Sequence, residues 1–135
     1  MMVDPFRGSG EVLRPDQEMV QGRKNRDFFA NRKAQAWWEL RMRFMRTFRA
    51  VTQGVKTDPD ELIAISSEIA HKAKLTKELS QPTFSINGAG KIVIDKAPDE
   101  ARSPNLADAV MICYASNRSV LRVSQAAVAA MQGRR

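Results

Sequence analysis

Apolar residues recur at steps of three and four between about residues 27 and 52, and this spacing predicts a long amphipathic helix. Asp27 or Asn31 can cap its beginning, and Gly54 can end it. We interpret its tryptophans as core residues, because packing is a far commoner role for such a stripe than base stacking. The apolar stripe consists of Ala34, Trp37, Trp38, Leu40, Phe44, Met45, Phe48 and Val51.

Strict alternation of apolar and polar residues replaces this helical spacing further along the chain and predicts a β-hairpin over residues 83–95. The connecting residues 87–90 read Asn-Gly-Ala-Gly, and Asn and Gly tolerate the positive φ angles of a tight turn. No Lys-Ser or Lys-Thr pair follows these glycines, so the sequence does not support a phosphate-binding P-loop here. The alternating apolar positions are Phe84, Ile86, Ile92 and Ile94.

Shorter patterns divide the rest of the chain. Residues 72–79 predict a short helix that ends before Pro82. Residues 62–65 are apolar and rich in isoleucine, which fits either a strand or the beginning of a helix. Residues 1–6 predict a short strand, and the polar residues 11–27 predict a loop that includes at most a helical turn.

A third helix is predicted from Ser103 to Tyr114, and it is apolar on almost every side. Ser103 is a favourable N-cap, and Pro104 then falls at the first helical position. Such a helix is usually buried, so its one carboxylate, Asp108, must be paired, hydrogen-bonded or bound to a metal. Asp108 is therefore either a structural acid favoured by the helix dipole or a metal ligand in a phosphodiester-cleaving site. The core that we expect combines Trp37, Trp38, Phe44, Phe48, Leu106, Val110 and the hairpin isoleucines.

Charge changes the picture, because the net charge of +7 is concentrated at the two ends of the 135-residue chain. Residues 1–50 carry 11 Lys and Arg against 6 Asp and Glu, and residues 118–135 carry 4 basic residues and no acidic one. A basic surface favours polyanions, most plausibly nucleic acid, although it also fits a solvated surface without a partner. The single cysteine excludes an internal disulfide, and no apolar run is long enough to span a membrane.

Several segments together resemble a known family. Residues 103–109, Ser-Pro-Asn-Leu-Ala-Asp-Ala, resemble the last acidic motif of the nuclease domain of phage terminase large subunits. Residues 31–41, Asn-Arg-Lys-Ala-Gln-Ala-Trp-Trp-Glu-Leu-Arg, look like the long basic helix of that domain. Ser-Gln-Pro-Thr at residues 80–83, Lys-Ile-Val-Ile-Asp-Lys at residues 91–96 and then Arg102 follow in the expected order.

The resemblance covers about residues 1–115 and implies an α+β fold, namely the C-terminal portion of an RNase H-like nuclease domain. Residues 116–135 then form a basic tail, which the Ala- and Val-rich residues 120–131 predict to be helical. The upstream acids and the ATPase motor of this family have no counterpart here, so the chain is expected to be a fragment of a terminase large subunit.

The resemblance also implies a function. The intact nuclease domain cuts concatemeric double-stranded DNA of a phage or prophage by two-metal-ion hydrolysis, with Mg²⁺ or Mn²⁺ as cofactor. Asp108 is the catalytic, metal-binding residue that the resemblance carries over. Implied partners are double-stranded DNA, the small terminase subunit and the portal or prohead, in the cytoplasm of a bacterial host and without a membrane. The basic residues predicted to contact DNA are Lys91, Lys96, Arg102, Arg32 and Lys33.

The number of acids leaves the enzymatic activity of this chain open. A metal-ion nuclease needs about three converging carboxylates, and only Asp108 is placed with confidence, with Asp95 and Asp4 as further candidates. The alternative is a non-catalytic basic DNA-binding or assembly module, such as a prophage remnant. We expect the isolated chain to bind metal weakly and to be inactive, with Asp108 paired to Lys96 or Arg102. Another class of enzyme is disfavoured, because there is one histidine and no nucleophile or cofactor motif.

Overall fold

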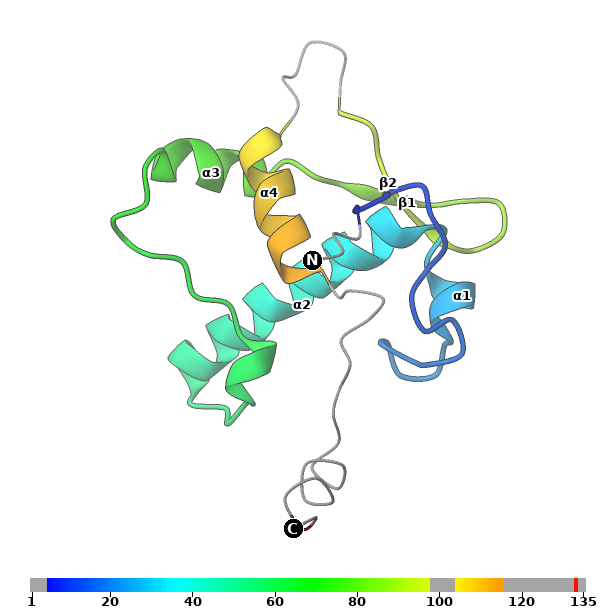
Figure 1. Ribbon diagram of the computed structural model, residues 1–135, viewed down its shortest axis with the longest axis horizontal. Helices are drawn as coiled ribbons and strands as arrows, with labels where there is room; N and C mark the ends of the chain where they lie inside the picture. The colour runs from blue at the N-terminus through cyan, green and yellow to red at the C-terminus, as the bar shows by residue number, and fades with distance from the viewer. Residues whose placement is uncertain (1–4, 98–103, 116–132, 134–135) are drawn as a thin grey trace.

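The computed structural model describes residues 5–97, 104–115 and 133 (Figure 1). Helices and one antiparallel pair of strands make up this part of the chain, which confirms the predicted α+β class. Within the described residues, no helix is both long and apolar enough to cross a membrane. The elements are α1 (Asn25–Phe28), α2 (Arg32–Gln53), a 3₁₀ turn η1 (Pro59–Glu61), α3 (Lys72–Leu79), β1 (Phe84–Ile86), β2 (Ile92–Ile94) and α4 (Asn105–Tyr114).

Helix α2 confirms the long helix predicted from the apolar stripe, and it begins at the second of the two candidate caps. The Asn31 side-chain oxygen accepts a hydrogen bond from the Ala34 amide at 2.9 Å. Asp27 instead belongs to the short helix α1. Gly54 ends α2 with a left-handed φ of 64°, a conformation in which a side chain on Cβ would be strained.

The hairpin is also confirmed, with Phe84 opposite Ile94 and Ile86 opposite Ile92. The other edge of β2 is paired as well, because the Ala30 amide donates to the Ile92 carbonyl at 2.9 Å. Arg23 extends this contact to the hairpin turn by donating to the Gly90 carbonyl at 3.3 Å. The loop that precedes α2 is therefore attached to the hairpin, as the blue and yellow-green segments of Figure 1 show.

The core has two parts on either side of the first half of α2. Helix α4 packs against both α2 and α3, and their contact forms the larger part (Figure 1). The smaller part joins the loop before α2 to β2 through Phe29, Ala34 and Ile92, and Trp38 is half-buried against it. The larger part consists of Ala36, Trp37, Leu40, Ile63, Ala107 and Met111.

Several residues predicted for the core lie outside it. Phe44 and Phe48, in the second half of the α2 stripe, are exposed, and Phe48 is 62% exposed. Ile86 is exposed at the free edge strand, whereas Ile92 is buried. Helix α4 is predicted to be buried, and in the structure it is fully buried only at Ala107 and Met111, so its burial is partial.

Residues 62–65 form neither the strand nor the helix that their composition allows. Side chains of α2 satisfy their backbone instead, because the Thr47 hydroxyl accepts from the Ile63 amide at 2.9 Å. The Arg43 guanidinium donates to the carbonyl oxygens of Asp60 and Leu62 at 2.7 and 2.9 Å. The helix predicted at residues 72–79 is confirmed, and most of the strand predicted at residues 1–6 lies outside the described residues.

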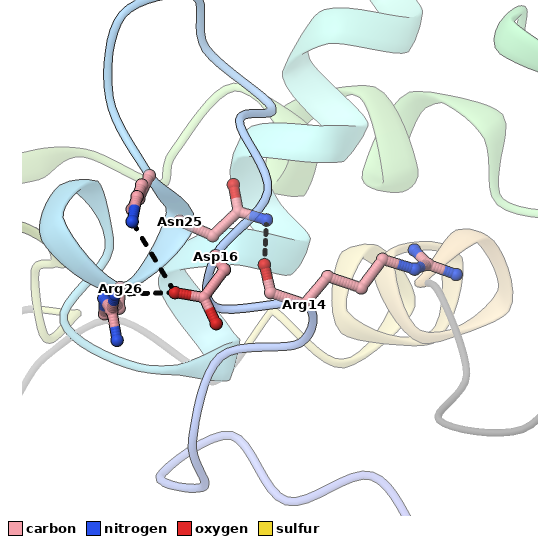
Figure 2. A network of polar contacts seen from close by, with 5 residues as sticks. Arg14, Asp16, Asn25 and Arg26 are labelled. Carbon is pink, nitrogen blue, oxygen red and sulfur yellow. Dashed lines mark hydrogen bonds and ion pairs between the residues drawn. The ribbon is translucent and has the colours of Figure 1, made fainter.

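The predicted loop before α1 is held by two buried amide side chains. The Gln35 side chain both donates to and accepts from the Leu13 backbone, at 2.9 and 2.7 Å. Figure 2 shows the second contact, in which the Asn25 side chain donates to the Arg14 carbonyl at 3.0 Å. The nearby carboxylate of Asp16 is 2.6 Å from the Arg26 guanidinium, but this exposed ion pair contributes little to stability.

Candidate functional site

Asp108 lies in the first turn of α4, directly after a residue that is fully buried. Ala107 and Met111 fix the helix against the core, while the Asp108 side chain is half-exposed. Its amide donates to the Pro104 carbonyl at 2.8 Å. Within the part of the chain that the structure describes, the Asp108 carboxylate makes no hydrogen bond or ion pair. The described residues thus leave the Asp108 carboxylate available to a ligand.

A different carboxylate satisfies the N-terminus of α4. Glu78 Oε2 accepts hydrogen bonds from the amides of Leu106 and Ala107 at 2.7 and 3.0 Å. Glu78 comes from the last turn of α3 and is only 7% exposed. No local spacing in the sequence connects Glu78 to α4, so its role could not be predicted from the sequence. The sequence predicts Pro104 as the first helical residue, whereas in the structure Pro104 takes the N-cap position, without a side chain that can cap the helix.

Of the two partners predicted for Asp108, Lys96 forms no ion pair with it in the structure. Lys96 is exposed and is the second residue after the end of β2, following Asp95. Arg102, the other predicted partner, lies outside the described residues, as does Asp4.

The basic residues predicted to contact DNA fall into two groups. Lys33 and Lys96 are exposed and Lys91 is half-exposed, so their ammonium groups can reach a phosphate. Arg32 is only 5% exposed, and its guanidinium stacks 4.9 Å from the centroid of the Phe6 ring. A buried and stacked guanidinium is less accessible to DNA than these lysines, so Arg32 is the least exposed of the predicted contacts that the structure describes.

Asp95 has a distinct environment on the hairpin. Its two carboxylate oxygens accept hydrogen bonds from the hydroxyl groups of Ser85 and Thr83, at 2.7 and 2.8 Å. These hydrogen bonds lower the pKa of Asp95 below its usual value, and the bond from Ser85 has the larger effect. The carboxylate is therefore ionised at neutral pH, and both of its oxygens are hydrogen-bonded within the hairpin. Across the described residues, no group of three or more acidic, histidine or cysteine side chains is arranged to hold a metal ion.

Some arginines of the basic helix α2 have structural partners. Arg41 lies 4.7 Å from the Trp38 ring centroid and 5.6 Å from that of Phe84, and Arg43 lies 5.1 Å from that of Tyr114. Cation–π contacts of this kind hold a guanidinium in place. The basic character of α2 therefore serves packing as well as any contact with a polyanion.

Several solved structures that resemble this chain are viral nuclease domains. The nuclease domain of the large terminase subunit of bacterial virus Sf6 matches with a TM-score of 0.76 and 33% identity, over 83% of this chain and 52% of that chain. A lysine-to-alanine variant of that domain, solved with manganese, matches with a TM-score of 0.74 and 34% identity, over 83% of this chain and 53% of that chain.

A third structure, of the same variant with manganese and beta-thujaplicinol, has a TM-score of 0.76 and 34% identity, over 83% of this chain and 52% of that chain. The chain matches no protein-family model and no curated protein. It spans about half the length of the solved domains that it resembles. The resemblance predicted from the sequence is confirmed: this chain is related to part of the nuclease domain of a phage terminase large subunit.

Proposed function

We propose that this chain forms one wall of a terminase-type nuclease site, in which Asp108 is a catalytic residue and metal ligand. The observation that carries the proposal is the position of Asp108 in a chain related to a terminase nuclease domain. Its carboxylate lies on a firmly packed helix turn and has no protein partner among the described residues. A preorganised carboxylate of this kind suits Mg²⁺ or Mn²⁺, which prefer oxygen ligands.

The fit to a divalent cation is good for Asp108 and poor for Asp95, whose oxygens already accept two hydroxyl groups. When bound, a pair of cations would activate a water molecule and stabilise the leaving oxygen of a phosphodiester. Since no three-acid group lies within residues 5–97 and 104–115, the remaining ligands would come from acids beyond those residues. In our proposal the described residues therefore position one ligand and do not complete the site.

Double-stranded DNA is the proposed substrate, and the described cations that would contact it are Lys33, Lys91 and Lys96. Lys91 and Lys96 flank β2, so their ammonium groups would meet the phosphate backbone near the hairpin. Arg102, which precedes α4 in the sequence, would be a further contact. By the same relationship, the proposed setting is phage or prophage DNA packaging in a bacterial host, with the small terminase subunit and the portal or prohead as assembly partners.

One observation favours a second candidate, a DNA-binding or assembly module without catalysis. The described residues offer exposed lysines but no complete set of metal ligands. Both candidates predict salt-dependent binding of DNA. Only the first predicts that a divalent cation binds at Asp108.

The test is an NMR titration of the ¹⁵N-labelled full chain with Mn²⁺, whose unpaired electrons broaden the signals of nearby amides. We expect broadening centred on Asp108, at millimolar Mn²⁺, because one firm ligand binds this cation weakly. Asp108→Asn should abolish the broadening, whereas Asp95→Asn, the matched control on the hairpin, should leave it unchanged. Broadening elsewhere, or broadening that persists in Asp108→Asn, would exclude Asp108 as the ligand and leave the DNA-binding module.

A further inference from the structure

The buried carboxylate of Glu78 carries an inference that deepens the proposed role of Asp108 and rests on it. Glu78 lies near the end of α3, 28 positions before Leu106 in the chain. One of its oxygens, Oε2, accepts from the Leu106 amide at 2.7 Å and from the Ala107 amide at 3.0 Å. Both bonds end on a single atom, so α3 holds the first turn of α4 at one point.

Helix α4 has no cap of its own within the described residues. The first amides of any helix lack intrahelical acceptors, and the N-cap of α4 is Pro104, whose side chain makes no capping hydrogen bond. An anionic acceptor is especially favourable at this end, because the helix dipole and the charge-assisted hydrogen bonds act together. Among the described residues, Glu78 thus takes the role of the N-cap of α4.

The dependence is mutual, since a carboxylate that is 7% exposed is costly to bury without compensation. The two α4 amides provide most of that compensation. Lys74 adds a weaker contribution, with its ammonium nitrogen 3.9 Å from Glu78 Oε1 and its side chain largely exposed. Burial of the Glu78 carboxylate therefore favours the arrangement of α3 against α4 in which both amides reach it.

Asp108 is the next residue after the two that Glu78 holds, and its own amide bonds to the Pro104 carbonyl within the same turn. An acid in this turn often serves the helix dipole itself. Here Glu78 already occupies that place, so the Asp108 carboxylate is left for another ligand. We propose that Glu78 is the positioning residue of the site: it fixes the first turn of α4 and thereby directs Asp108 toward the metal.

Two substitutions of Glu78 separate the effect of its hydrogen bonds from the effect of its charge. Glu78→Gln keeps an oxygen that can accept both amides, because a single oxygen accepts them in the structure. Glu78→Ala removes the acceptor and leaves two buried or half-buried amides without a partner. Glu68→Ala is the matched control, since Glu68 is an exposed glutamate that precedes α3.

The experiment uses the ¹⁵N-labelled full chain and two readouts. Amide hydrogen exchange at Leu106 and Ala107 reports whether the turn is held, and Mn²⁺ broadening at Asp108 reports whether the carboxylate is directed. In Glu78→Ala we expect exchange at both amides to accelerate about tenfold, and the Mn²⁺ concentration for half-maximal broadening to rise several-fold. Glu78→Gln should largely restore both readouts, and Glu68→Ala should change neither.

The outcomes distinguish this proposal from the one on which it rests. Faster exchange in Glu78→Ala with unchanged Mn²⁺ broadening would make Glu78 a purely structural cap and overturn the proposal. If Mn²⁺ does not act at Asp108 in the unaltered chain, the proposed function fails. In that case unchanged ¹H and ¹⁵N shifts of the Asp108 amide in Glu78→Ala would overturn the positioning role too, whereas displaced shifts would support it. If Glu78→Ala does not fold, Glu78→Asp takes its place, because its side chain is shorter by one methylene. The same two readouts then test the positioning role.

Discussion

Leu40 and Phe48 belong to the same apolar stripe of α2, and the structure gives them opposite surroundings. Leu40 is 2% exposed and packs in the cluster that joins α2 to α4, whereas Phe48 is 62% exposed. Substituting each by alanine therefore tests the packing of the helix with a matched pair. Alanine is a good helix former, so neither change weakens the helix by itself.

The expected loss for Leu40→Ala follows from its burial. Removing a fully buried leucine side chain forfeits about 1.5–3 kcal/mol of transfer free energy, and the remaining cavity raises the total to about 2–5 kcal/mol. Phe48→Ala removes a side chain that is mostly in water, so the free energy of unfolding should change by less than about 0.5 kcal/mol.

Urea unfolding of the full chain, followed by tryptophan fluorescence, measures both changes. With a slope of about 2 kcal/mol per molar urea, Leu40→Ala should lower the midpoint by roughly 1–2.5 M. Phe48→Ala should leave it almost unchanged. If Phe48→Ala lowered the midpoint as far as Leu40→Ala, the second half of α2 would be covered in solution and our account of this surface would be wrong. A loss below about 1 kcal/mol for Leu40→Ala would show that the α2–α4 contact is loosely packed.

Three further predictions concern charge and chemistry. Reversing the charge of Lys91 and Lys96 together should weaken binding of duplex DNA and reduce its dependence on salt, as measured by fluorescence anisotropy; an unchanged slope would remove both from the contact surface. The lowered pKa of Asp95 stabilises the fold above pH 3.8, the ordinary value of this carboxyl, and the contribution is lost as the pH falls through the pKa of the folded state. The difference in urea midpoint between the unaltered chain and Asp95→Asn should therefore shrink from pH 7 to pH 3, and a constant difference would contradict this linkage. The isolated chain should not nick plasmid DNA with Mn²⁺, and cleavage that Asp108→Asn abolishes would reveal a complete site in this chain.

Local signals in the sequence were sufficient for the elements that depend on local interactions. The apolar stripe and the Asn31 cap predicted α2, and the alternating residues around the Asn-Gly turn predicted the hairpin. Periodicity did not reveal how far a stripe is covered, which is why Phe48 was wrongly placed in the core. It also treated Arg32 as a surface cation, although the ring of Phe6 lies over its guanidinium.

Of the residues in the proposed site, the sequence indicates Asp108 through the motif that surrounds it. Glu78 has its effect across 28 positions, and no spacing rule connects the end of one helix to the beginning of another at that distance. Residues 62–65 were ambiguous for a similar reason, since their backbone partners are the side chains of Arg43 and Thr47 on α2. Long-range partners of this kind depend on the packing of the whole chain.

The attachment of the N-terminal loop to the hairpin has a consequence for the order of folding. The Arg23 guanidinium reaches the Gly90 carbonyl across 67 positions, and the Ala30 amide meets β2 at Ile92. Closing so long a loop costs conformational entropy before the contact stabilises anything, whereas the hairpin and α2 need only local contacts. The residues before α2 should therefore settle last during folding and open first in hydrogen exchange, ahead of the turn that carries Asp108.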